Sequence, residues 1–382
     1  MPRHTIMDIR DIATRIAEYA GDREFLPFSN TCKMFRDIWG TRPKITLPVD
    51  TYTTTASLHE FFDTGLRPRS SLINRAVKMR RMDLMDVASS RGCIVSDKTF
   101  STTASRGYMD GLIWAMKKGN IEFPREKNTR LRKIALNSAA YGGHIDIVKY
   151  LIDQGVTVDH NTCYHASRGG KLETLRYLRK INCPWDKMTC NAAASNGHLD
   201  VLKWAHENSC KSDYHLFRYA AFGGNVGVIR YVIEIYPNYN MLGHDLCTAT
   251  ASGGHIDALD FYKQRGLLWS SDTCRNAIAH NHVKVLGWGI QNQQMVSRDP
   301  SIMAWASVNN DVDTMDWLMD NGFQYDYMLC KMAAMKGSLK VLEWAWSKGI
   351  QFDQETWCGG ILGKKQYILD YLREKGCPGS FS

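Results

Sequence analysis

The sequence contains no apolar run approaching the roughly 18 residues that a membrane-spanning helix needs. Its first ten residues lack the apolar core of a secretory signal, so we expect neither a membrane protein nor export by that route. An intracellular location, cytoplasmic or nuclear, is the expectation. Glycine (30) and proline (10) are too few and too scattered for a collagen-like or low-complexity chain. Eleven cysteines in a chain of this kind indicate free thiols rather than a disulfide framework.

Signatures of catalysis and of cofactor or metal binding are also missing. There is no Gly-x-Ser-x-Gly elbow, no phosphate-binding Gly-Lys-Ser/Thr loop and no Cys-x-x-Cys pair. Cys163 and His165 are two residues apart, a spacing that directs their side chains about 200° apart on a helix. We therefore expect a protein that is not an enzyme and that holds no metal or cofactor.

Positive charge is concentrated in one stretch of the chain. The net charge is +9, but residues 67–133 hold 16 Lys and Arg against 6 Asp and Glu, so the remainder sums to −1. A solvated face is the simpler interpretation. The alternative is a patch for an acidic protein surface or phosphate, and its candidate residues are Lys78, Arg80, Arg81, Arg125, Lys127, Arg130, Arg132 and Lys133. Among the functions that we considered, nucleic-acid binding here is the weakest.

What the sequence does contain is an internal repeat. Gly-His-Ile/Leu-Asp recurs at residues 143–146, 197–200 and 254–257, and weaker copies fall in phase with it. Seven of the ten spacings between successive glycine-slot positions are 27 residues. We call these positions anchors, and they are Arg80, Gly107, Gly143, Gly170, Gly197, Gly224, Gly254, Asn281, Asn310, Gly337 and Lys364.

Columns that did not define the repeat agree with it. The residue seven after the anchor is aromatic in ten of eleven units, and the residue four before it is always small, for example Ala193. Apolar residues after the anchor follow a helical stripe, and the anchor itself supplies a turn that ends a preceding helix. Five aspartates, each 16 residues after an anchor, are placed to cap that preceding helix: Asp159, Asp186, Asp213, Asp326 and Asp353.

Each unit is therefore predicted to be a helix, a tight turn, a second helix and a short loop. A 27-residue helix pair cannot bury its apolar face alone, so the units must stack. We expect an all-α solenoid of about eleven units, in which the aromatic column packs between repeats rather than stacking on bases.

The columns resemble the ankyrin repeat in a short form. The resemblance is carried by the stretch 183–204, which reads Cys-Pro-Trp-Asp, then Thr-Cys, Ala-Ala and Gly-His-Leu-Asp-Val-Leu-Lys-Trp, and it covers about residues 67–382. The usual Thr-Pro-Leu-His start is absent and the unit is about six residues short of 33, so we expect the projecting finger to be a loop. The resemblance implies a monomeric protein-binding module.

The segment before the repeats resembles an F-box. Its run of Ile16, Tyr19, an acidic-basic turn, Phe25-Leu26, Phe28 and Cys-Lys-Met-Phe-Arg at 32–36 is typical of that family, although the opening Leu-Pro is missing. Such modules dock the Skp-type adaptor of cullin-RING ubiquitin ligases. By this resemblance the adaptor-binding residues are Ile12, Ile16, Tyr19, Phe25, Leu26, Phe28 and Phe35. A helical cap on the first repeat is the alternative.

The sequence thus predicts an F-box-like module at 1–43, a linker and N-terminal cap at 44–66 and the solenoid at 67–382. The predicted function is substrate recognition for a cullin-RING ligase, and the target is an unidentified protein. A plain ankyrin scaffold or inhibitor without a ligase link is the alternative. The combination of F-box and short ankyrin repeats is similar to proteins of large DNA viruses and some algae, which for a virus implies the host cell.

Overall fold

The computed structural model describes residues 55–63, 70–119, 129–237, 245–266, 269–292, 294, 296 and 298–379. Every regular element within these ranges is an α-helix. None of the helices in the described ranges is long and apolar enough to cross a membrane. The F-box-like segment lies outside the described residues, and so does most of the predicted linker and cap.

The chain divides into two compact units, one of Met1–Ala139 with Asp146–Val156 and one of Ala140–Ile145 with Thr157–Ser382. Two helices of the first unit cross its boundary, since α8 ends and α9 begins in the second unit. The helices of the first unit are α3 (Thr55–Asp63), α4 (Ser70–Lys78), α5 (Met82–Ser90), α6 (Asp97–Ser105), α7 (Met109–Lys118), α8 (Thr129–Gly142) and α9 (Ile145–Asp153).

The second unit continues the helix pairs with α10 (His160–Arg168), α11 (Leu172–Lys180), α12 (Lys187–Ser195), α13 (Leu199–Glu207), α14 (His215–Gly223), α15 (Val226–Ile235), α16 (Asp245–Gly253), α17 (Ile256–Lys263), α18 (Ser271–Ala279), α19 (Val283–Gln291), α20 (Ser301–Ser307), α21 (Val312–Asp320), α22 (Met328–Lys336), α23 (Leu339–Ser347), α24 (Gln354–Gly363) and α25 (Gln366–Glu374).

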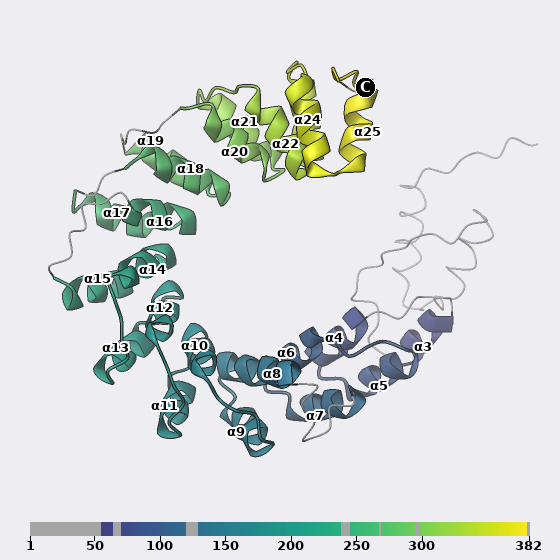
Figure 1. Ribbon diagram of the computed structural model, residues 1–382, viewed down its shortest axis with the longest axis vertical. Helices are drawn as coiled ribbons and strands as arrows, with labels where there is room; N and C mark the ends of the chain where they lie inside the picture. The colour runs from purple at the N-terminus through teal and green to yellow at the C-terminus, as the bar shows by residue number, and fades with distance from the viewer. Residues whose placement is uncertain are drawn as a thin grey trace, which may run out of the picture. The chain divides into compact units, whose positions relative to one another are not determined.

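Within the second unit the helices form two rows (Figure 1). The even-numbered helices α10 to α24 pack on one another along the inner side of the curve, and each also packs on the odd-numbered helix that follows it. The odd-numbered helices lie outside and touch one another less. This arrangement confirms the predicted all-α solenoid of helix pairs.

The small-residue column explains why the inner row packs so closely. Ala193, Ala220, Ala277 and Ala333, each four residues before an anchor, are at most 1% exposed. A side chain without a γ-carbon lets neighbouring helix backbones approach, and larger side chains at these sites would have no free volume. The small residue predicted at this position is therefore buried between inner helices.

The predicted caps are also present. A side-chain oxygen of Asp159 accepts a hydrogen bond from the backbone N–H of Asn161 at 3.0 Å, and one of Asp186 accepts from Met188 at 2.9 Å. The other three aspartates accept in the same way from residues of the first turn: Asp213 from His215, Asp326 from Met328 and Asp353 from Thr356. These bonds satisfy amides that no helix carbonyl can reach.

Candidate functional site

The turn between the two helices of a unit depends on a left-handed backbone. All eleven anchors have a positive φ, from 51° at Lys364 to 87° at Gly143. Glycine adopts this conformation without strain, and asparagine tolerates it better than most residues. The anchor column deduced from spacing is therefore a column of left-handed turns.

The side chain after most anchors also makes contact with the unit before it. A Cβ placed on Gly170 would lie 2.6 Å from Nδ1 of His198, and His282 occupies the same space beside Gly254. His198 Nε2 lies 3.1 Å from the carbonyl oxygen of Arg168, and because a carbonyl only accepts, the nitrogen donates. These histidines therefore join successive turns, as expected for residues of separate units.

The aromatic column lies between units, as predicted, but it pairs in a way that the spacing did not reveal. The residue six after an anchor faces the aromatic residue seven after the next anchor. Where the first residue is Asp, the aromatic is Trp and its Nε1–H donates to Oδ1: Trp114 to Asp86 at 2.8 Å, Trp288 to Asp260 at 2.9 Å and Trp344 to Asp316 at 2.9 Å.

Three consecutive units use a cation at the same position instead. Each cation lies over the ring of the next unit, a favourable placement against the negative face of an aromatic. The pairs are Arg176 over Trp204 at 5.9 Å, Lys203 over Tyr231 at 5.5 Å and Arg230 over Phe261 at 4.8 Å from the ring centroid. We call both kinds of contact the outer ladder. Its rings are used in holding repeats together, which argues against a role in base stacking.

The cysteines of the described residues are free thiols, and all but Cys358 are buried. Burial raises the pKa of Cys247 to about 11 and that of Cys330 to about 12. The Sγ of Cys183, Cys210 and Cys377 lies 3.2–3.3 Å from the carbonyl oxygen of the capping aspartate 24 residues earlier. Buried thiols with a raised pKa, such as those of Cys247 and Cys330, are poor nucleophiles and serve packing.

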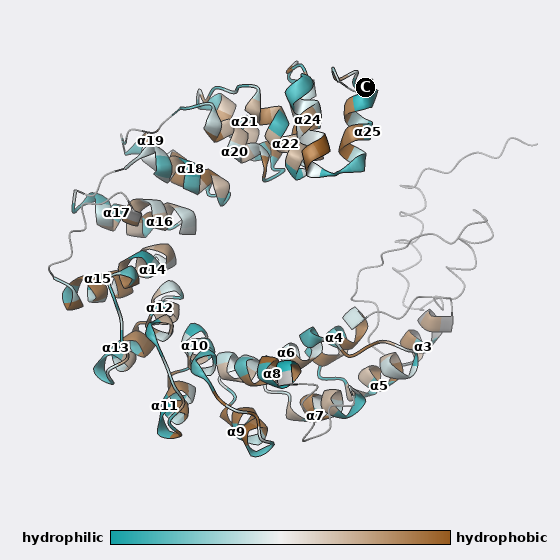
Figure 2. Ribbon diagram, viewed as in Figure 1, coloured by the Kyte–Doolittle hydropathy of each residue, from teal (hydrophilic) through white to brown (hydrophobic). Residues whose placement is uncertain are grey.

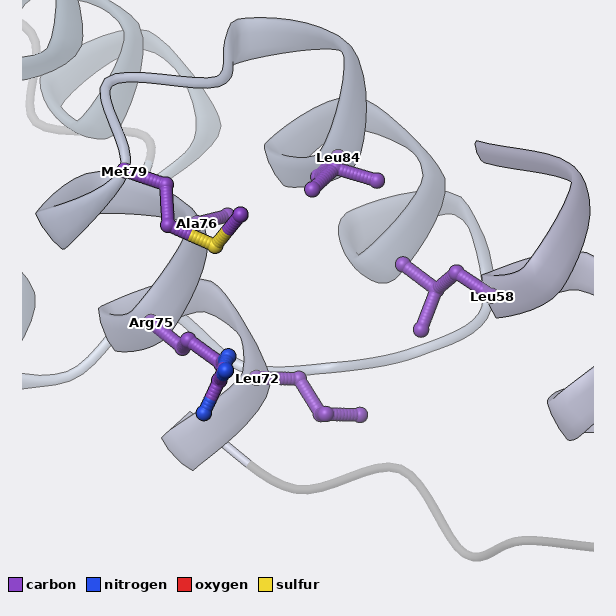
Figure 3. Close-up of a pocket in the computed structure, with 6 residues that line it drawn as sticks. All are labelled: Leu58, Leu72, Arg75, Ala76, Met79 and Leu84. Atoms are coloured by element: carbon purple, nitrogen blue, oxygen red, sulfur yellow. The ribbon is translucent and has the colours of Figure 1, made fainter. Parts of the chain in front are cut away.

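Metal ligands do not gather in the part of the chain that the structure describes, where no group of three His, Cys, Asp or Glu side chains could hold an ion. A shallow apolar hollow lies between α3, α4 and α5 (Figure 3). It is lined by Leu58, Leu72, Arg75, Ala76, Met79 and Leu84. None of these side chains is suited to act as a general acid, a general base or a nucleophile.

The structure separates the described members of the basic patch into two groups. Arg80 donates to the carbonyl oxygen of Arg106, just beyond the end of α6, whereas Arg130 binds Asp97 at its start. A nine-residue helix is about 13 Å long. Lys78 and Arg81 lie with Arg80, and Arg132 and Lys133 lie with Arg130.

Several of these cations already have roles within the fold. Arg81 pairs with Asp83, and the pKa of that carboxyl is lowered chiefly by the hydrogen bond from the guanidinium. Arg132 is 8% exposed. Arg125 and Lys127 lie outside the described residues, as do all seven predicted adaptor-binding residues: Ile12, Ile16, Tyr19, Phe25, Leu26, Phe28 and Phe35.

The surface best suited to a partner is the exposed stripe of the inner helices. It consists of the residues nine, five and two before each anchor, which recur at helical spacing on one face. Most of the described ones are exposed or half-buried, and Ala192, Ala249 and Gly359 are buried. In α14 they are His215, Tyr219 and Phe222, and Phe222 is 45% exposed. The repeat spacing could have identified this stripe. Once the buried columns are assigned to the other positions of the inner helix, the stripe is the face that remains.

Comparison with known proteins agrees with a repeat architecture. A model of the ankyrin repeat matches residues 133–163. Similar solved structures include the pentatricopeptide repeat protein PPR10 in complex with an 18-nt psaJ RNA element (12% identity, 95% of this chain and 63% of that chain, TM-score 0.28). Another is PPR10 from maize (11% identity, 97% and 59%, TM-score 0.33).

The chain thus spans about three fifths of the length of these pentatricopeptide repeat structures, and the TM-scores are too low to carry an argument about its ligand. No curated protein matches the chain. What the geometry and the comparisons jointly establish is an all-α helical-repeat solenoid with an ankyrin repeat match at residues 133–163.

Proposed function

We propose that the protein is a non-enzymatic recognition subunit that holds a target protein on the inner face of the solenoid and links it to a cullin-RING ubiquitin ligase. The observation that carries the binding half is the stripe of the inner helices, on which large apolar side chains such as Phe222, Trp305 and Leu362 are 42–64% exposed. The ligase half rests on the F-box resemblance of residues 16–36.

The mechanism that follows is proximity rather than chemistry. A receptor that binds target and adaptor simultaneously raises the effective concentration of the target beside the ligase. This mechanism needs no nucleophile, metal or cofactor in the chain. It is compatible with the raised pKa values and the burial of the cysteines described above.

Co-purification of a Skp-type adaptor with the full chain tests the ligase link. We expect the adaptor to be retained by the natural sequence and lost from Leu26→Asp, since an F-box docks through apolar side chains. Thr14→Ala, at a residue outside the predicted docking set, is the matched control and is expected to retain the adaptor. Both variants should keep the helical circular dichroism and melting temperature of the natural chain.

Failure of the natural, folded chain to retain any Skp-type adaptor contradicts the ligase link. The protein would then be an ankyrin-type scaffold or inhibitor that acts through its inner face alone. Retention by Leu26→Asp would instead show that these apolar residues do not form the docking site.

A further inference from the structure

We propose that the inner face of α20, α22 and α24 binds an amphipathic helix of a partner protein that carries acidic residues along one flank. The inference rests on the proposed function, since it assigns a partner chemistry to the inner face. It begins from a local concentration of large apolar residues on that face, centred on α22.

The exposed stripe of α22 consists entirely of methionine. Met328, Met332 and Met335 occupy its three positions, and each is half-buried. Methionine is flexible and polarizable, so a methionine surface adapts to different apolar partners. The same three positions in α10 hold Asn161, His165 and Arg168, so the stripe is not apolar by default.

Neighbouring helices extend the methionine stripe in both directions. Trp305 holds the second position in α20 and is 42% exposed, and Val308, the residue directly after α20, holds the third. Leu362 holds the third position in α24 and is 64% exposed. The end of α24 is accordingly brown in Figure 2. Val308, Met335 and Leu362 thus form a row across three consecutive inner helices, which we call the apolar row.

The spacing of the apolar row favours a helix as its occupant. Helices in contact lie about 8–10 Å apart, so the row presents an apolar side chain at that interval. Residues i and i+7 of a helix lie on one face about 10 Å apart. In an extended strand, residues of one face lie about 6.6–6.8 Å or about 13 Å apart, and neither spacing matches the interval of the row. An amphipathic helix therefore places one residue on each position.

Charge beside the row favours an acidic flank on that helix. Lys336 is the last residue of α22, and Lys364 and Lys365 lie in the turn that follows α24. All three are exposed, and none is in an ion pair with a carboxylate of the described residues. Lys331, on the face itself, is already bound to Glu355 at 2.6 Å. Carboxylates on the turn side of a bound helix would meet the three lysines, which adds orientation and rate of association more than affinity.

Fluorescence anisotropy with labelled synthetic peptides and the full chain tests the proposal. One probe is an 18-residue helix-forming peptide with Leu at i, i+4, i+7, i+11 and i+14 and Glu along one side of that stripe. The second is a scrambled peptide of the same composition without a continuous stripe. The third carries a central proline that breaks the helix. We expect the first probe alone to bind.

Substitutions in the row and outside it locate the site. Met335→Glu and Leu362→Glu should each weaken the first probe at least about tenfold, since each places a charge in the desolvated centre of the contact. Ile94→Glu makes the same kind of change at a residue that is 76% exposed and lies outside the stripe, and it should leave the affinity unchanged. Lys336→Glu combined with Lys365→Glu should weaken the Glu-bearing probe and favour the same probe made with Lys.

Equal binding of the stripe and scrambled probes overturns the proposal, as does unchanged affinity in both Met335→Glu and Leu362→Glu. Adaptor co-purification on the same samples separates this failure from failure of the proposed function. A chain that retains the adaptor but binds no helical probe overturns only the partner chemistry. Loss of the probe from Met335→Glu with the adaptor retained supports it.

Discussion

The indole Nε1–H of Trp344 donates a 2.9 Å hydrogen bond to Oδ1 of Asp316, a residue of the preceding repeat. The same carboxylate lies 2.8 Å from Nζ of Lys348, and these two bonds lower its pKa, the one from Lys348 most. One acidic side chain therefore joins two units of the outer row. Its counterparts are Asp86 with Trp114 and Asp260 with Trp288.

Breaking this bond from either side should destabilise the protein. We expect Asp316→Ala and Trp344→Phe each to lower the free energy of unfolding, Asp316→Ala by about 1 kcal/mol for the lost hydrogen bond. The double variant should lose less than the sum, because one interaction is removed twice. Denaturant titration of the four proteins measures the coupling. Strict additivity would contradict an energetic link between the two residues.

The left-handed anchors predict opposite effects at two equivalent positions. Gly170→Ala adds a Cβ at φ 67° and 2.6 Å from His198, so it should destabilise the protein by about 1–2 kcal/mol or more. Lys364→Gly removes the steric strain of a side chain at φ 51° and should raise the free energy of unfolding by up to about 1 kcal/mol. Melting temperature and denaturant midpoint report both. Equal signs for the two substitutions would be inconsistent with the anchor geometry.

Overpacking the inner row should also destabilise the stack. Ala193 is fully buried, so Ala193→Leu forces neighbouring helices apart and should lower the free energy of unfolding by about 1–3 kcal/mol. Glu207→Leu, which places a leucine on an exposed position of α13, is the control and should change the stability little. Unchanged stability in Ala193→Leu would mean that the small column does not lie at the contact.

Two histidines should make the stability depend on pH. Burial, and next the nearby Arg168, lower the pKa of His165, and burial is also the main cause that lowers the pKa of His282. The unfolded chain therefore takes up these protons first. The contribution of these histidines to the free energy of unfolding is complete above the ordinary histidine pKa of about 6.5, and it is lost as the pH falls through their lower pKa in the folded state.

Urea titrations at pH 7.5 and pH 5.5 check this expectation. The natural chain should lose stability at pH 5.5, and His165→Gln should lose less, because glutamine does not titrate. A variant with the same pH dependence as the natural chain would show that His165 is not one of the groups responsible.

The anchors and the aspartate caps could be predicted from the sequence because each is a local requirement of one unit, and the small column could be predicted because it recurs at the same position of every unit. A left-handed turn needs glycine or asparagine, and a first-turn amide needs an acceptor within two or three residues. Lys364 fits the column by spacing alone. Its φ of 51° shows that the fold imposes the turn even on a lysine.

The outer ladder could not be predicted in the same way, because its partners lie 28 to 31 residues apart in different units and their chemistry changes from repeat to repeat. Arg230 and Asp260 occupy equivalent positions, but Arg230 lies over the ring of Phe261, whereas Asp260 accepts a hydrogen bond from the indole of Trp288. The basic stretch shows the converse. Arg80 and Arg130 both belong to the basic stretch at residues 67–133, but they contact opposite ends of α6.

The outer ladder also restricts how such a chain can lose a repeat by recombination, because every junction needs two compatible halves. Deleting residues 281–309 would bring Asp260 opposite Trp317, an indole that can donate to it. Deleting residues 310–336 would instead leave the Trp344 indole opposite Gly287, with no side-chain acceptor. Two deletions of nearly equal length are therefore not equivalent. Whether a repeat can be gained or lost depends on the side chains of the two repeats that become neighbours, and not on the single repeat that is inserted or removed.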